Sequence, residues 1–290
     1  MFASTLDLVR DAQDKGYAIP AFNIVDDLSV RAIVEAADRS RSPVIIQASL
    51  KTARSIGVEL LTNVFSASLV DVRVPVAMHL DHCPDRSVIA DVIGAGWSSV
   101  LFDASDRDYD RAVSETGEVV ALAHSRGATV ETEIENIVGV EDGVGSDVIA
   151  HAYSVEQVTE AAKTSGADLI APQLGTAHGE YHGRPRLLPD RVREFRALSD
   201  KPIVLHGGTG LTEAEFRSFI SAGVSKINIS TAIKQTYMKS QLDFLKIAED
   251  KGRWDPPSMF RQTQGALRAA ATEFFEIFGS AGRADPRLQR

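Results

Sequence analysis

The chain of 290 residues lacks most features of secreted, membrane-spanning and nucleic-acid-binding proteins. Its single cysteine, Cys83, excludes an internal disulfide and suits a reducing cytoplasm. No run reaches the ~18 apolar residues that a membrane span needs. The first 25 residues carry acidic side chains in place of the apolar segment of a signal peptide. The net charge of −9 argues against a nucleic-acid partner, because phosphate backbones attract basic surfaces.

The chain also lacks low-complexity segments and Pro/Gly/Ser-rich linkers. A chain of this length could hold two average domains, or one α/β barrel of about 250 residues with a tail. We expect a single domain over residues 1–290, with a barrel over about 1–235 and helices over about 236–280.

Short apolar runs alternate with longer amphipathic stretches along the chain. The runs are β-branched or apolar and are often entered through Gly, Pro or Ser, as buried strands are. They are AIPAFNI (18–24), PVIIQAS (43–49), VPVAMHLD (74–81), SSVLFDA (98–104), TVETEIE (129–135), ADLIAPQL (167–174), PIVLHGG (202–208) and KINISTA (226–232). Helical patterns lie between them, for example at 28–39, 108–125, 154–165 and 212–222. Eight alternating units predict parallel strands closed into a (β/α)₈ TIM barrel, with a doubly wound open sheet as the alternative.

The C-terminal tail has a helical pattern. It covers residues 235–252, breaks at Asp255-Pro256-Pro257 and resumes over 265–279. We expect the tail to complete the outer ring of helices and to help cover one end of the barrel.

Polar side chains follow nearly every predicted strand. In a barrel the carboxyl ends of the strands converge on one mouth, which is where barrel active sites lie. Packing alone does not explain this pattern, because a buried polar group without a partner costs about 1–3 kcal/mol. We therefore predict a functional site at this mouth, with candidates at Asn23, Ser49, Asp81, His82, Asp103, Glu133, His178, His206 and Asn228 through Thr231.

Three of the seven histidines end predicted strands: His82, His178 and His206. A lone histidine is more often a hydrogen-bonded structural residue, but three at one mouth favour a metal site. Neutral imidazole is a common ligand of Zn²⁺, and catalytic zinc typically takes three protein ligands. We expect structural roles for the histidines that lie elsewhere, which include His79, His124 and His151.

Acidic residues stand beside these histidines. Asp81 precedes His82 directly, so their side chains would point to opposite faces of a strand unless the strand turns there. Asp81 could act as a general acid/base or could orient a ligand histidine. Glu131, Glu133 and Glu135 alternate and would share one face, which implies a metal or cation partner for at least one of them.

Glycine-rich loops follow the last two predicted strands. Residues 206–210 read HGGTG, and residues 228–231 read NIST before a helix. A GGxG run alone is more often a plain turn. Its place after His206 and beside Thr231 favours phosphate binding by backbone N–H groups and a helix N-terminus.

At these residues the sequence resembles the class II, metal-dependent ketose-bisphosphate aldolases, which include fructose- and tagatose-bisphosphate aldolases. The resemblance covers nearly the whole chain. It rests on PAFNI (20–24), HLDHC (79–83), FDAS (102–105), VETEIE through VEDGVG (130–145), GTAHGEY (175–181), VLHGGTGL (204–211), KINIST (226–231) and FGSAGRA (278–284).

The resemblance implies a zinc-dependent enzyme. It cleaves a ketose (bis)phosphate reversibly to dihydroxyacetone phosphate and an aldehyde, with zinc as a Lewis acid. His82, His178 and His206 would bind zinc, with Glu133 and Asp103 nearby as alternative ligands or as partners of the ligands. Asp81 would be the acid/base for the C4 hydroxyl, and Glu141 the proton carrier at the nucleophilic carbon. The expected substrate-binding residues are Asn23, Ser49, Gly179, Gly207, Gly208, Thr209, Asn228, Ser230 and Thr231.

Other expectations concern cofactors and partners. A monovalent cation, Na⁺ or K⁺, could lie near the phosphate. The partner would be a small sugar phosphate, with no nucleic acid and no membrane, and the protein would be a homodimer or homotetramer in the cytoplasm. No lysine Schiff base is required, and Lys226 is the lysine nearest to such a position.

Several positions depart from the family pattern. Ser230 stands where many members have aspartate, and His182 stands where a lysine is common. Asp255-Pro256-Pro257 replaces an Asp-Pro-Arg motif whose arginine grips the second phosphate in a neighbouring subunit's site, although Arg261 could substitute. The missing arginine makes an aldolase of a ketose 1-phosphate with an unphosphorylated aldehyde an alternative. A non-catalytic sugar-phosphate binder and a metal-dependent barrel hydrolase, which would use the same histidines to activate water, are further alternatives.

Overall fold

The computed structural model describes residues 2–141, 144–146, 148, 150–179, 181, 183 and 185–288. Among them, parallel strands close into a barrel in the order β1-β10-β9-β8-β5-β4-β3-β2. The barrel strands are β1 (Ile19–Asn23), β2 (Val44–Ser49), β3 (Val76–Cys83), β4 (Ser99–Asp103), β5 (Thr129–Glu133), β8 (Leu169–Ile170), β9 (Ile203–Leu205) and β10 (Val224–Ile229). A short antiparallel pair, β6 (Gly139–Glu141) and β7 (Val144–Ser146), follows β5. The predicted TIM barrel is confirmed, and the open sheet is wrong.

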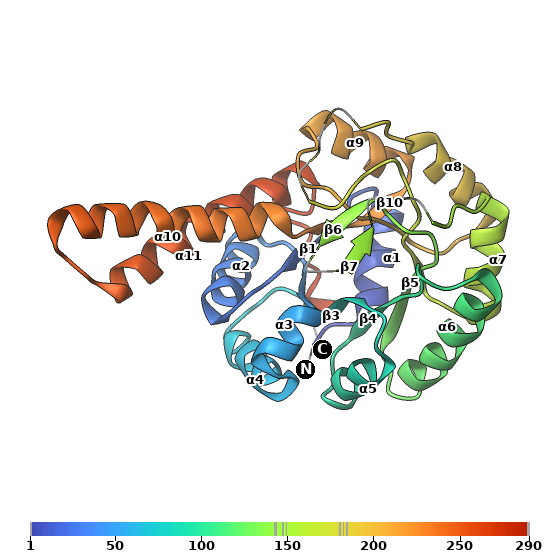
Figure 1. The fold of residues 1–290 in the computed structure, drawn as a ribbon, viewed down its shortest axis with the longest axis horizontal. Coiled ribbons are helices and arrows are strands. Elements are labelled where there is room, and N and C mark those ends of the chain that lie inside the picture. Colours follow the sequence, from blue (N-terminus) through green and yellow to red (C-terminus); the bar gives the residue numbers. More distant parts are fainter. Residues whose placement is uncertain are drawn as a thin grey trace.

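Helices surround the strands (Figure 1). They are α1 (Thr5–Lys15), α2 (Asp27–Ser40), α3 (Leu50–Ile56), α4 (Val58–Ser68), α5 (Arg86–Gly94), α6 (Tyr109–His124), α7 (Val155–Ser165), α8 (Pro189–Leu198), α9 (Glu213–Ala222), α10 (Thr231–Lys251) and α11 (Pro256–Ile277). Capping boxes start α7 at Ser154 and α9 at Thr212, because each hydroxyl accepts the N–H of the residue three positions on. None of the helices in the described ranges is long and apolar enough to cross a membrane.

The buried side chains inside the barrel change character along each strand. Ile19, Ala21 and Val204 belong to a buried cluster with the apolar face of α1, which covers the amino-terminal end of the barrel. Two residues further along the same strands, and therefore on the same inward face, Asn23 and His206 lie at the opposite end of the barrel. The apolar half of the barrel is therefore sealed by α1, and the polar half lies at the carboxyl ends of the strands.

The tail forms the hairpin of α10 and α11, which projects from the barrel (Figure 1). The carboxyl-terminal part of α11 packs on the barrel, where Phe275 meets Phe22 edge-on with ring centroids 5.7 Å apart. Leu288 packs against the cluster under α1, so the tail does help to cover that end of the barrel. The projecting part of the hairpin was not anticipated from the sequence.

Candidate metal centre and active site

A bulge in β3 brings Asp81 and His82 to the same mouth. From Leu80 to Cys83 the strand advances three residues while β4 advances two. The backbone of His82 lies in the left-handed region, with φ of 43°. This conformation costs a non-glycine residue about 1–2 kcal/mol. The strand therefore turns at the position where sequence alternation alone would have sent the two side chains to opposite faces.

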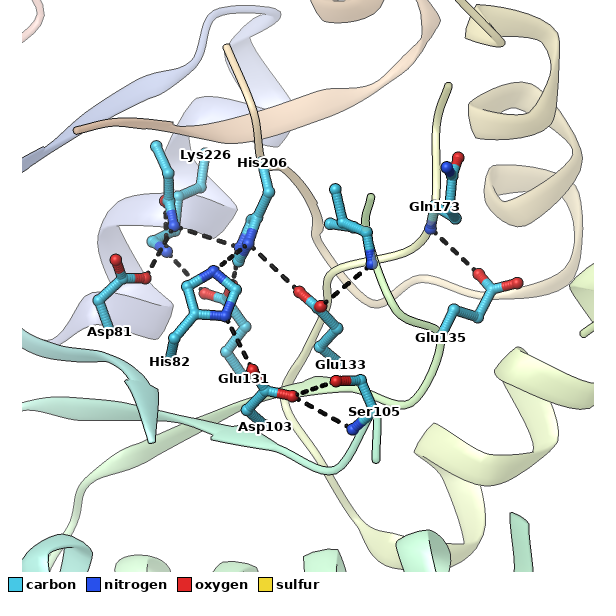
Figure 2. Close-up of polar contacts among 12 residues, drawn as sticks. Asp81, His82, Asp103, Ser105, Glu131, Glu133, Glu135, Gln173, His206 and Lys226 are labelled. Carbon is cyan, nitrogen blue, oxygen red and sulfur yellow. Dashed lines mark hydrogen bonds and ion pairs between the residues drawn. The ribbon is translucent and has the colours of Figure 1, made fainter. Parts of the chain in front are cut away.

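Four buried side chains converge beside this bulge. His82, Glu133, His178 and His206 each offer one ligand atom, and these atoms lie within 4.8 Å of one another. The Nε2 atom of His82 and the Nδ1 atom of His206 are 2.9 Å apart. The Oε2 atom of Glu133 lies 3.3 Å from the same His206 nitrogen. The three predicted zinc histidines are thus brought together, with one carboxylate among them (Figure 2 shows all but His178).

The potential ligand atoms of this group suit a metal ion. His82 Nδ1 lies 3.0 Å from Asp103 Oδ2, and His206 Nε2 lies 2.7 Å from Glu131 Oε1. A carboxylate on the outer nitrogen of a neutral imidazole holds the proton there and leaves the inner lone pair for a metal. With the protons held there, the two inner nitrogens, 2.9 Å apart, would both present lone pairs to a metal, and Glu133 Oε2 has no hydrogen-bond donor among the described residues. One cation satisfies all three atoms, and a set of imidazoles with a carboxylate suits Zn²⁺.

Asp103 lies behind His82, outside the group of potential ligands. Burial would raise its pKa. The hydrogen bond from His82 and two from Ser105, one by the hydroxyl at 2.6 Å and one by the backbone N–H at 3.1 Å, lower that pKa to about 2. Asp103 is therefore a fixed carboxylate that orients His82 (Figure 2). Of the two positions foreseen for it, the geometry corresponds to a partner of a ligand.

The three glutamates of the fifth predicted run have three different environments. Glu131 accepts from Lys226 Nζ at 2.7 Å, and Glu133 belongs to the group of potential ligands. Glu135 pairs with Arg191 at 2.9 Å and points away from the other two (Figure 2). The expected cation partner is present for two of them. Burial raises the pKa of Glu133, and the negative charge of Asp103 nearby raises it further.

Amide side chains hold Asp81 on both of its oxygens. Asn23 Nδ2 donates to Oδ2 at 2.8 Å, and Asn228 Nδ2 donates to Oδ1 at 3.1 Å. The orientation of each amide is fixed from behind, because Gln47 donates to the Asn23 carbonyl at 2.6 Å and Lys226 to the Asn228 carbonyl at 2.8 Å. N–H donors to both oxygens hold the carboxylate in a fixed position. This arrangement suits a group that accepts a proton from a substrate hydroxyl.

The glycine-rich loop after β9 is packed against the loop that carries His178. Gly207 has φ of 66°, and a Cβ there would lie 2.4 Å from the carbonyl oxygen of Ala177. The Tyr181 hydroxyl donates to the Gly207 carbonyl at 2.6 Å. Only glycine fits this close approach of two backbones. The two loops therefore meet at the mouth, where Gly179 with φ of 81° also lies next to His178.

The strand ends around β10 and β2 hold the remaining candidates. The Thr209 hydroxyl accepts the N–H of Ala232 at 3.2 Å, which ties the glycine loop to the first turn of α10, where Thr231 is the first residue. The Ser230 hydroxyl is buried and has no hydrogen-bond partner in the described part of the chain. Ser49 caps α3, because its hydroxyl accepts the N–H of Thr52 at 3.3 Å. Ser230 is thus poised for a ligand, whereas Ser49 already serves a helix.

Two predicted or noted residues lie outside the described structure, and two residues of the site were not predicted from the sequence. The backbone of Glu141 is in β6, but its side chain lies outside the described structure, as does His182. Gln47 and the pairing of Lys226 were not foreseen. An alternation of two would have found both, because Gln47 precedes Ser49 by two residues and Lys226 precedes Asn228 by two on the inward face.

Comparisons with known proteins agree with this geometry. The family described as "Fructose-bisphosphate aldolase class-II" matches residues 3–283. The chain is 34% identical to the fructose-bisphosphate aldolase of Geobacillus stearothermophilus, covering 97% of this chain and 98% of that protein. It is 32% identical to the fructose-bisphosphate aldolase of Staphylococcus aureus strain Mu50, covering 97% and 98%. Its structure resembles that of the YdjI aldolase from Escherichia coli K12 with a TM-score of 0.83, at 26% identity and covering 98% and 100% of the two chains. The chain therefore belongs to the class II fructose-bisphosphate aldolase family and is a carbon–carbon lyase.

Proposed function

We propose that this enzyme cleaves fructose 1,6-bisphosphate reversibly to dihydroxyacetone phosphate and an aldehyde phosphate, with Zn²⁺ as its metal. The observation that carries the proposal is the convergence of three histidines and Glu133 next to Asp81, whose two oxygens accept amide donors. A hydrolase would need the metal to activate water, and the relatives named above are aldolases. The family therefore supports carbon–carbon chemistry at this centre.

His82, His178 and His206 would hold the metal, with Glu133 as a fourth donor. Zn²⁺ at this position would polarise the oxygen atoms of a bound ketose as a Lewis acid. Asp103 and Glu131 hold the outer nitrogens of two of the histidines, so the ligand geometry is preset before substrate arrives. A monovalent cation near the phosphate stays a prediction.

Asp81 would perform the proton transfer at the substrate hydroxyl. During cleavage the bond between C3 and C4 breaks, the C4 hydroxyl gives its proton to Asp81, and the C4 carbonyl of the aldehyde forms. During condensation the same carboxylic acid returns the proton. The carbon that keeps the bonding electrons takes up a proton in its turn, and Glu141 remains our candidate to deliver it.

The phosphate would lie between the glycine loop and α10. Backbone N–H groups of Gly208 and Thr209 and the amino-terminal turn of α10 at Thr231 offer donors to an anion. Gly179 and Gly207 shape the same corner. The Ser230 hydroxyl, which has no partner among the residues that the structure describes, offers a further donor. This corner would concentrate an anionic substrate at the mouth of a chain whose net charge is −9.

A panel of substrates tests the proposal. The purified enzyme loaded with Zn²⁺ is assayed for triose-phosphate release from fructose 1,6-bisphosphate, tagatose 1,6-bisphosphate and fructose 1-phosphate. We expect the highest kcat/KM with fructose 1,6-bisphosphate and complete loss of activity in excess EDTA. A preference for fructose 1-phosphate would instead support an unphosphorylated aldehyde partner. Tight binding of the three compounds without turnover of any would contradict the proposed activity and support a non-catalytic sugar-phosphate binder.

We further infer that the protein is a homo-oligomer joined through the α10–α11 hairpin. Large apolar side chains are exposed along this projecting element: Met238, Leu242, Leu245, Ile247, Trp254 and Phe260. Patches of this kind mark interaction surfaces. Light scattering should give a dimer or tetramer, and charged substitutions at Leu242 and Trp254 should reduce the mass. A wild-type monomer at all concentrations would refute this.

Buried Cys83 suits the reducing cytoplasm in which we place the enzyme.

A further inference from the structure

Lys226 is a fully buried lysine in the interior of the barrel. It comes from β10, and its ammonium group donates to two acceptors that belong to different parts of the site. One is Glu131 Oε2 at 2.7 Å, and the other is Asn228 Oδ1 at 2.8 Å. A lysine is almost never fully buried unless it is paired. The proposed chemistry above gives it no role.

The first contact leads to the metal centre. Glu131 accepts from Lys226 with one oxygen and faces His206 Nε2 with the other, at 2.7 Å. Glu131 is buried, and its carboxylate bridges the Lys226 ammonium and the His206 ring. A carboxylate beside Nε2 keeps the proton of His206 there, and this leaves Nδ1 to face the other potential ligands (Figure 2).

The second contact leads to the acid/base. An ammonium group can only donate, so the atom of Asn228 that faces Lys226 must be the carbonyl oxygen. The NH₂ group of Asn228 is then directed to Asp81, to which it donates at 3.1 Å. Without the ammonium the amide could turn over and present its oxygen to the carboxylate.

We propose that Lys226 is a positioning residue that sets the metal ligand His206 and the acid/base Asp81 at the same time. One buried charge fixes the tautomer of His206 through Glu131 and the amide orientation of Asn228. The proposal rests on the proposed function, because it gives Asp81 the acid/base role. Loss of the ammonium should therefore weaken metal binding through Glu131 and slow turnover through Asn228, whose NH₂ group also lies 3.2 Å from His206 Nε2.

Two variants separate these routes. Lys226→Met leaves Glu131 as a buried carboxylate without its ammonium partner, and we expect about 10–100-fold weaker Zn²⁺ binding in competition with a chromogenic chelator. The double variant Lys226→Met with Glu131→Gln removes both charges, and a glutamine carbonyl can still accept from His206. We expect its Zn²⁺ affinity to return to within about threefold of wild type. Its kcat for fructose 1,6-bisphosphate should stay at least roughly tenfold below that of wild type with KM little changed, because no ammonium fixes the orientation of the Asn228 amide.

A matched control comes from the third glutamate of the same run. Arg191→Met removes the partner of Glu135, another buried carboxylate. In the described part of the chain, neither residue forms a hydrogen bond or ion pair with the proposed metal ligands or with Asp81. It should lower the unfolding temperature and leave Zn²⁺ affinity and kcat within about twofold of wild type.

Each outcome decides the question. Wild-type Zn²⁺ affinity in the folded Lys226→Met protein overturns the proposal, as does a double variant with wild-type kcat. An Arg191→Met protein that loses as much Zn²⁺ affinity as Lys226→Met also overturns it, because the effect would then be general. The double variant creates no new unpaired buried charge and keeps the test available if Lys226→Met does not fold. If wild type binds Zn²⁺ but cleaves none of the ketoses, the proposed function fails, while the affinity measurements still decide the His206 route.

Discussion

Asp81→Asn is the sharpest test of the proton transfer. The substitution changes almost no volume but removes the base, so kcat should fall by about 10²–10⁴-fold. This corresponds to roughly 3–5 kcal/mol in the activation free energy. The new amide at position 81 also meets two N–H donors, from Asn23 and Asn228, whose orientations are fixed by Gln47 and Lys226. It can satisfy only one of them with its oxygen, and its NH₂ group must face the other.

The structure therefore predicts a second loss that a simple isosteric change would not give. A buried donor left without an acceptor costs about 1–3 kcal/mol, which in a chain of this size lowers the unfolding temperature by several degrees at roughly 2–4 °C per kcal/mol. Turnover is measured by triose-phosphate release with saturating Zn²⁺, and unfolding by calorimetry of the same preparations. A kcat within tenfold of wild type would refute the acid/base role. An unchanged unfolding temperature would refute the fixed orientation of the two amides.

The metal centre and the glycine loop give three further predictions. Removal of the metal with EDTA should abolish cleavage, and Zn²⁺ at 100 times its Kd should restore it while stabilising the fold by about 2.7 kcal/mol in a thermal melt; activity that survives EDTA would contradict a metal centre. Asp103→Asn should weaken Zn²⁺ binding by about 10–100-fold in chelator competition, because it removes the carboxylate behind His82; an unchanged affinity would show that this contact does not orient the ligand. Gly207→Ala should destabilise the protein far more than Gly252→Ala in chemical denaturation. Both glycines have positive φ, but only at position 207 would the new Cβ meet a backbone oxygen, that of Ala177 at 2.4 Å; equal losses would refute the argument from close approach.

The barrel and the membership of its mouth could be predicted from the sequence because both follow from local patterns. Each barrel strand falls on an apolar run, except that β3 extends two residues past its run and β10 begins two residues before its own. The polar residues that end these runs meet because parallel strands finish at one end of a barrel. His82, His178 and His206 could be grouped in this way without knowledge of any distance.

The pairings inside the site could not be predicted, because they depend on contacts between distant parts of the chain. Glu131 meets Lys226 across 95 positions, and Glu135 meets Arg191 across 56. The spacing of the three glutamates at every second position predicts that they share a face of the strand, but it does not predict which cation pairs with each of them. The left-handed backbone of His82 also has no sequence signal, because histidine does not mark such turns as glycine does.

The bulge at His82 has a mechanical consequence. The proposed acid/base, Asp81, and the potential metal ligand His82 are neighbours in the chain, so a single peptide unit of about 3.8 Å between Cα atoms sets the spacing of their backbones. Any movement of helices or loops around the mouth could change what surrounds this pair, but it could not pull the two backbones apart. The spacing that the proposed proton transfer needs is therefore set by covalent geometry.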